Sequence, residues 1–173
     1  MLEASRLEQG KIKISKTNVD MNRLSAEAMI TYEQRLTEKN INVDLQLDGE
    51  ECIALADKDS IKRVLINLID NAIKFTPEGG NITVTTKRQD KKIHVSIQNS
   101  GEGIPQEDLR HIWERFYKSD KSRGMDKKGV GLGLHIVKTI ISQHQGEIFA
   151  ESEEGTFARF TFILDEGTKG VVS

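Results

Sequence analysis

Three polar side chains along one predicted helix have spacings that place them on a single face. Asn67, Asn71 and Lys74 are separated by four and three residues, and residues at these spacings are neighbours on a helix surface. A carboxamide oxygen can bind Mg²⁺, and an ammonium group supplies a point charge for phosphate. The face therefore predicts a site for a magnesium-bound phosphate compound, although taken alone it is more typical of a solvated helix surface.

Two glycine-rich segments add to this prediction. The segment 99–105, Asn-Ser-Gly-Glu-Gly-Ile-Pro, follows a predicted strand, and the segment 129–134, Gly-Val-Gly-Leu-Gly-Leu, runs into a predicted helix. Glycines let the backbone approach a ligand closely, and the free amides at a helix start attract phosphate. A flexible loop before a helix explains the second segment equally well on its own. Together with the helix face, the two segments favour a triphosphate.

Several other kinds of site are excluded. The chain contains no Gly-x-x-x-x-Gly-Lys-Ser/Thr motif, and a charged stretch instead of a strand precedes Gly129, so neither a P-loop nor a Rossmann turn is present. The signatures of eukaryotic-type protein kinases are also missing. The formal net charge of -2 provides no overall field for a polyanion, so we expect no nucleic-acid partner. The single cysteine, Cys52, cannot form an internal disulfide and fits a reducing compartment.

Hydrophobic periodicity predicts the elements that position these residues. Predicted helices begin at Met21 with Asp20 as N-cap, at Asp57 or Asp59, shortly after Pro105, and at 129–133. The third is a short amphipathic helix with apolar residues at Leu109, Ile112, Trp113 and Phe116. Predicted strands cover 41–47, 53–55, 82–86, 93–97, 147–151 and 157–164. Hairpins dominate this order, which predicts an α+β fold with an open, mostly antiparallel sheet and helices on one face; the residues after Asp165 are expected to fray.

The sequence resembles the catalytic ATP-binding domain of bacterial sensor histidine kinases. Residues 67–74 look like the N box of that family, 99–105 like the G1 box, 113–118 like the F box and 129–134 like the G2 box, all in the family's order. Residues 5–11 look like the end of the dimerisation hairpin and its linker, so the resemblance spans nearly the whole chain. It implies the Bergerat, or GHKL, fold, an α+β two-layer sandwich.

The resemblance implies that Mg-ATP lies between the N-box helix and a lid. Asn71 would then hold Mg²⁺, Lys74 would meet phosphate oxygens, Asn67 would lie beside the triphosphate, and Lys118 would reach the γ-phosphate. Thr156 would lie near the adenine edge. The other expected nucleotide contacts are Asn99, Gly101, Gly103, Ile104, Tyr117, Gly129, Gly131, Leu132, Gly133 and Leu134.

The same resemblance implies a division of the chain and a set of partners. Residues 1–17 would be the end of the dimerisation hairpin and linker, 18–166 the catalytic domain and 167–173 a C-terminal tail. The family's phosphoacceptor segment, Ser/Ala-His-Glu-Leu-Arg-Thr-Pro, does not occur. We therefore expect the γ-phosphate to pass to a histidine on a dimerisation domain absent from this chain, with a cognate response regulator in the full system. The fragment is expected to be a cytoplasmic monomer from a parent that can be an inner-membrane sensor.

Two residues depart from patterns of this superfamily. The G1 box usually begins with aspartate, which accepts a hydrogen bond from adenine, and Asn99 stands there instead, so adenine selection is expected to be weaker. Hydrolysing relatives such as gyrase and Hsp90 carry a general-base glutamate where Asn67 stands, and a carboxamide cannot take a proton near neutral pH. Phosphoryl transfer is therefore favoured over two alternatives. The first is a GHKL-type ATPase or nucleotide-gated interaction module. The second is a regulatory domain that docks on partners without binding nucleotide.

Overall fold

The computed structural model describes residues 13–114, 130–168 and 172. Within these ranges no helix is long and apolar enough to cross a membrane. The elements in chain order are β1 (Thr17–Asp20), α2 (Met21–Thr31), α3 (Glu33–Glu38), β2 (Asn42–Gln46), β3 (Ile53–Ala56), α4 (Lys58–Phe75), β4 (Asn81–Gln89), β5 (Lys92–Ser100), α6 (Val130–Gln143), β6 (Glu147–Glu153) and β7 (Phe157–Asp165).

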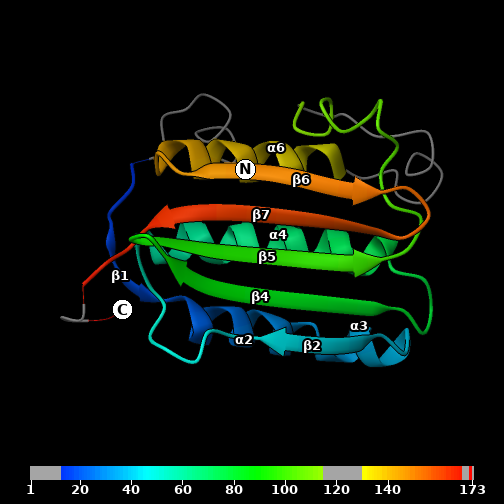
Figure 1. Cartoon of the computed structure of the whole chain (residues 1–173), viewed down its shortest axis with the longest axis horizontal. Helices are drawn as coiled ribbons and strands as arrows, with labels where there is room; N and C mark the ends of the chain where they lie inside the picture. Colours follow the sequence, from blue (N-terminus) through cyan, green and yellow to red (C-terminus); the bar gives the residue numbers. More distant parts are fainter. Residues whose placement is uncertain (1–12, 115–129, 169–171, 173) are drawn as a thin grey trace.

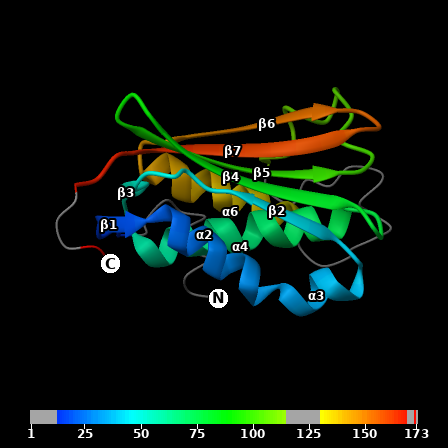
Figure 2. The same ribbon diagram turned by 60° about the horizontal axis from the view of Figure 1, so that its bottom comes forward.

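The described part of the chain forms two layers (Figures 1 and 2). Five strands make a sheet in the order β2-β4-β5-β7-β6, and α2, α4 and α6 lie along one face of it. The β2–β4 pair is parallel and the other neighbouring pairs are antiparallel. Strands β1 and β3 form a separate antiparallel pair. This arrangement confirms the predicted α+β sandwich with a mostly antiparallel sheet.

Helix α4 is the element on which the predicted site depends. The Asp57 side chain caps its start by accepting a hydrogen bond from the Ser60 N–H at 3.4 Å. Thr76 caps its end, and the following Pro77 cannot continue a helix. Its inner face consists of completely buried residues, each stabilising the fold by about 1.5–3 kcal/mol, namely Ile61, Val64, Leu65, Leu68 and Ile69. Because this face is fixed against the core, the polar residues between these positions must face away from it.

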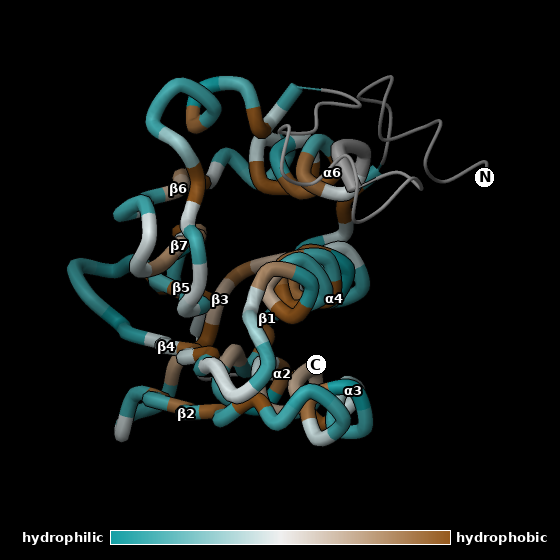
Figure 3. The backbone as a smooth tube through the Cα atoms, turned by 90° about the vertical axis from the view of Figure 1, so that its right-hand side faces the viewer, coloured by the Kyte–Doolittle hydropathy of each residue, from teal (hydrophilic) through white to brown (hydrophobic). Residues whose placement is uncertain are grey.

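Both predicted hairpins are confirmed. In the β4–β5 turn, Asp90 and Lys91 have φ of 54° and 62°, the conformation of a two-residue turn that suits the twist of paired strands. The β6–β7 turn covers 154–156, as the sequence predicts. Figure 3 looks along the strands and shows the sheet and the helices as separate layers. Ser100 at the end of β5 pairs with Phe157 at the start of β7, so the β6–β7 turn lies at the same end of the sheet as the end of β5.

The predicted helix after Pro105 is not present among the described residues. Residues 106–113 form successive turns instead, in which the His111 N–H donates to the Asp108 carbonyl at 2.8 Å and the Glu114 N–H to the His111 carbonyl at 3.0 Å. Trp113 packs edge-on against Phe160 of β7 with ring centroids 5.8 Å apart. The apolar spacing therefore reflects packing against the core, and successive four-residue turns achieve this packing without a regular helix.

Other local predictions also need correction. The helix predicted from Met21, whose apolar spacing continues to Leu36, breaks at Tyr32, which has φ -101° and ψ 11°, so α2 and α3 are separate. Strand β2 lies at the edge of the sheet where the sequence predicts a strand, and all five of its residues are exposed. Strand β1 has no counterpart in the sequence prediction. Residues 166–168 are bonded and not frayed, since the Gly167 N–H donates to the Ile53 carbonyl at 2.8 Å and the Thr168 N–H to Asn18 Oδ1 at 3.0 Å.

Candidate nucleotide-binding site

The polar face of α4 lies against the first turn of α6. Asn67 Nδ2 donates a hydrogen bond to the Gly133 carbonyl oxygen at 3.4 Å. Gly131 and Leu132 belong to the same turn of α6, and the buried side chain of Leu134 anchors the turn to the core. Amides at a helix start lack partners within the helix and can bind an anion. Two of the three elements predicted from the sequence are therefore in direct contact.

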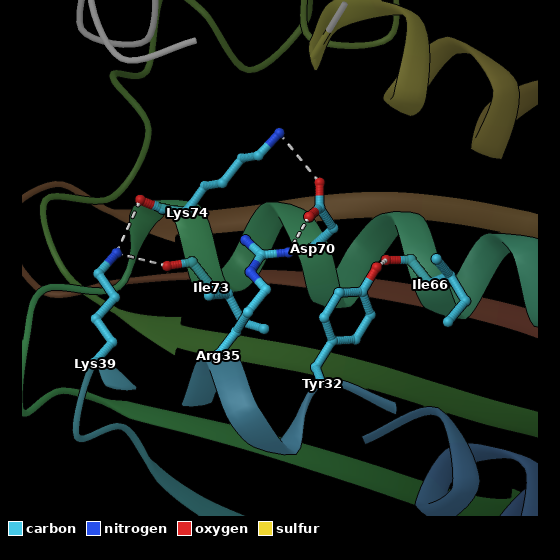
Figure 4. Close-up of polar contacts among 7 residues, drawn as sticks. All are labelled: Tyr32, Arg35, Lys39, Ile66, Asp70, Ile73 and Lys74. Carbon is cyan, nitrogen blue, oxygen red and sulfur yellow. Dashed lines mark hydrogen bonds and ion pairs between the residues drawn. The ribbon is translucent and has the colours of Figure 1, made fainter. Parts of the chain in front are cut away.

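Asn71 and Lys74 continue the same face of α4 toward its C-terminal end. Both side chains are partly buried, and Lys74 Nζ lies 3.2 Å from Asp70 Oδ2 (Figure 4). The spacing of four residues from Asp70 to Lys74 is the favourable one for an ion pair on a helix. Two carboxamides and a lysine therefore share one side of the helix, as the sequence predicts.

The glycine loop after β5 fits tightly between α4 and the β6–β7 turn. A Cβ atom added to Gly101 would lie 2.7 Å from the carbonyl oxygen of Phe75, the last residue of α4. The Gly101 N–H donates to the carbonyl of the exposed residue Thr156 at 3.2 Å. This close approach requires glycine, and it brings the third predicted element to the end of the α4 face.

Ile104, next to Gly103, is held by a residue that was not predicted from the sequence. Ser152 Oγ accepts a hydrogen bond from the Ile104 N–H at 2.7 Å and donates to the Phe157 carbonyl at 2.8 Å. Gly103 has φ of 73°, and an added Cβ would lie 2.7 Å from Ser152 Oγ. A serine in a strand gives no local signal of such a role, because both of its partners are distant in sequence or across a turn.

Asn99 lies near the end of β5, beside the glycine loop. Asn99 is 3% exposed and lies between Ile82 of β4 and Ala158 of β7 in the sheet register. Its Nδ2 donates to the Ser100 carbonyl at 3.0 Å. The carboxamide is therefore oriented by the backbone at the point where β5 ends.

Three of the predicted contacts, Tyr117, Lys118 and Gly129, lie outside the described residues. For the rest, the structure brings Asn67 to Gly133 and Gly101 to Thr156, and α4 connects the two groups. Asp70 was not predicted, although its spacing from Lys74 is a signal that could have found it. Arg35, which contacts Asp70 at 2.6 Å, gives no such signal because it lies 35 residues away.

This layered fold, with a polar helix face between two glycine-lined segments, defines a nucleotide-binding domain. Residues 56–168 match the family described as histidine kinase-, DNA gyrase B-, and HSP90-like ATPases, and the chain belongs to this family. It is 36% identical over 165 residues to the adaptive-response sensory kinase SasA of Crocosphaera subtropica. That match covers 95% of this chain and 43% of SasA, so the chain spans less than half of that relative.

Solved structures show the same fold. The nucleotide-free catalytic domain of histidine kinase ThkA has a TM-score of 0.78 and 34% identity, covering 88% of this chain and 96% of that one. Full-length ShkA in complex with AMPPNP has a TM-score of 0.84 and 27% identity, and the match covers 98% of this chain and 35% of ShkA. ThkA in complex with the response regulator protein TrrA has a TM-score of 0.76 and 31% identity, and the match covers 96% of this chain and 49% of that ThkA chain.

Proposed function

We propose that this chain is the catalytic module of a two-component sensor histidine kinase, which binds Mg-ATP and transfers the γ-phosphate to a histidine on a dimerisation domain. The observation that carries the proposal is Asn67, a carboxamide in contact with the Gly133 carbonyl. The resemblance places the general-base glutamate of hydrolysing relatives at this position. A carboxamide cannot activate water by taking its proton, whereas a neutral histidine already has a lone pair for attack.

The residues of the site fit a magnesium nucleotide. Asn71 offers one neutral oxygen, which suits a cation whose other ligands come from phosphate and water. Lys74 and the first turn of α6 offer positive charge and amide donors, and we assign the same function to Lys118. Bound Mg-ATP would supply the phosphoryl group and part of its charge neutralisation. The contribution of this chain is then positioning and electrostatic stabilisation, which are the main requirements of phosphoryl transfer.

The remaining nucleotide contacts and the partners are assigned on the same basis. Asn99, the glycine loop and Thr156 would surround the adenine end, and Tyr117 and 129–134 would lie toward the phosphates. The AMPPNP complex of ShkA and the TrrA complex of ThkA support ATP and a response regulator as partners. We place the linker in 1–17, the catalytic domain in 18–166 and the tail in 167–173. We also propose that the module works as a monomer in the cytoplasm, where ATP is available.

The decisive experiment combines this chain, Mg-ATP labelled at the γ-phosphate and a separately made dimerisation domain from the same parent. We expect acid-labile phosphate on the histidine of that domain, and no transfer when its histidine is replaced by glutamine. Rapid ATP turnover by this chain alone, without phosphohistidine, would instead identify an ATPase. No heat on titration with millimolar Mg-ADP would favour a regulatory domain without nucleotide.

Replacing Asn99 with aspartate is expected to tighten adenine nucleotide binding roughly fivefold. A charged acceptor contributes about 1.5–3 kcal/mol to a hydrogen bond, against about 0.5–1.5 kcal/mol for a neutral one. The same change removes the Nδ2 donor to the Ser100 carbonyl, so the nucleotide-free domain should lose about 1–3 kcal/mol of stability. Calorimetric titration with ADP and GDP measures the first effect and thermal unfolding the second. A sharp fall in affinity and in purine preference would show that Asn99 does not face adenine.

A further inference from the structure

An ion-pair cluster joins α3 to the polar face of α4, directly beside the proposed phosphate site. Arg35 Nη1 lies 2.6 Å from Asp70 Oδ1, and Lys74 Nζ lies 3.2 Å from Asp70 Oδ2 (Figure 4). One carboxylate is therefore divided between two cations, with one oxygen toward each. The three side chains are each about a third to two-fifths exposed, so water and ligands can reach them.

Arg35 holds its side of the carboxylate from a well-anchored position. Its guanidinium lies 5.3 Å from the centre of the Tyr32 ring, and the Tyr32 hydroxyl donates to the Ile66 carbonyl at 3.5 Å. Lys39 Nζ donates to the Ile73 carbonyl at 2.8 Å, which fastens the end of α3 to α4. Burial, and after it the charge of Asp70, raises the pKa of Tyr32. The position of Asp70 is thus set mainly from the α3 side.

Lys74 is the partner of Asp70 that also belongs to the proposed phosphate site. Its long side chain has four rotatable carbons and a compact charge, whereas Asp70 has a short side chain held by Arg35. On α4, Asp70 precedes Asn71 directly and lies one turn before Lys74, at the border of the face that carries the two asparagines. An anion that reaches this face must therefore share Lys74 with Asp70 or take Lys74 from it.

We propose that Asp70 is a positioning residue that competes with nucleotide phosphate for Lys74 and thereby weakens nucleotide affinity. This inference rests on the proposed function, because it requires Lys74 to meet phosphate. Arg35 moderates the competition by neutralising the other oxygen of the carboxylate. The consequence is faster release of the product nucleotide, at the cost of weaker binding of the substrate.

The test is a set of charge-neutralising variants of this chain, titrated with ADP and with adenosine at low ionic strength. Asp70→Asn keeps an acceptor oxygen and similar shape but removes the charge. Because partly exposed ion pairs are weak, we expect ADP to bind about twofold to fivefold tighter and adenosine to bind unchanged. High salt should reduce the gain, since exposed charges are screened. Arg35→Gln should weaken ADP binding by a similar factor, because Lys74 then faces the whole carboxylate charge.

Glu27→Gln is the matched control. Glu27 pairs with Arg23 at 3.6 Å with the same four-residue spacing, but on α2, so ADP affinity should not change. An Asp70→Asn variant with normal thermal unfolding that binds ADP equally or more weakly would overturn the inference, as would an equal gain for adenosine. If Asp70→Asn does not fold, unchanged or tighter ADP binding by Arg35→Gln overturns it. Failure of the unchanged chain to bind ADP would refute the proposed function itself, which separates the two outcomes.

Discussion

Alanine at position 71 is expected to lower phosphotransfer by at least about 100-fold, the scale for removing one preorganised electrostatic group. Asn71 supplies the only protein oxygen that we assign to Mg²⁺, and alanine offers no ligand in its place. Alanine is also a better helix former than asparagine by a few tenths of a kcal/mol, so α4 should not be weakened. Phosphohistidine formation with the separate dimerisation domain measures the rate, and ADP titration with and without Mg²⁺ measures binding. The Asn71→Ala variant should bind ADP with the same affinity in the presence and in the absence of Mg²⁺.

Two further variants make this prediction specific. Asn71→Asp keeps an oxygen ligand and should keep Mg²⁺-dependent binding. Asn42→Ala removes a carboxamide from the exposed edge strand β2 and should behave as the unchanged chain does. If Asn71→Ala still binds ADP more tightly in the presence of Mg²⁺, then Asn71 is not the metal ligand.

Alanine at position 103 should destabilise the domain by about 2–5 kcal/mol. Gly103 has φ of 73°, which costs an L-residue about 1–2 kcal/mol. Its added Cβ would also lie 2.8 Å from the Glu153 carbonyl oxygen and 2.9 Å from the Phe157 carbonyl oxygen, so the β6–β7 strands must shift. Overpacking of this kind costs about 1–3 kcal/mol. Thermal unfolding should show a midpoint lower by more than about 5 °C, and ADP binding should weaken because the loop moves.

Gly79→Ala separates the cost of the positive φ from the cost of overpacking. Gly79 has a similar φ of 79°, but an added Cβ would meet nothing within 4 Å. Only the backbone cost of about 1–2 kcal/mol should therefore appear, with nucleotide affinity unchanged. Equal losses of stability in the two alanine variants would mean that the glycine loop does not depend on the close approach to Ser152 and its neighbours.

Local rules predict the parts of this protein that depend on periodicity and capping. The apolar face from Ile61 to Leu68 and a capping aspartate at 57 or 59, of which the structure uses Asp57, specify α4 and with it the shared face of its polar residues. The hairpins follow from alternating apolar residues around short polar turns. These features involve neighbours within a few residues, where the geometry of one helix or one turn leaves few choices.

Features that pair distant segments were not predictable in this way. The β1–β3 pair and the turns from 106 to 113 have conformations that depend on packing against residues far along the chain. The same is true of the Ser152 bonds to the glycine loop. Trp113 illustrates the point. Its helical spacing from other apolar residues predicted a helix, whereas the structure has turns at 106–113 and packs the Trp113 ring edge-on against Phe160.

The amino-acid order alone therefore specifies the polar face of α4, since helix geometry puts two carboxamides and a lysine on one side of the helix whatever surrounds them. Folding in three dimensions decides what meets that side. The Gly133 carbonyl reaches Asn67 from 66 residues away, and Arg35 reaches Asp70 from 35 residues away. Hydrogen bonds and ion pairs act over a few ångströms regardless of sequence separation, so only the packing of α3, α4 and α6 brings these partners together.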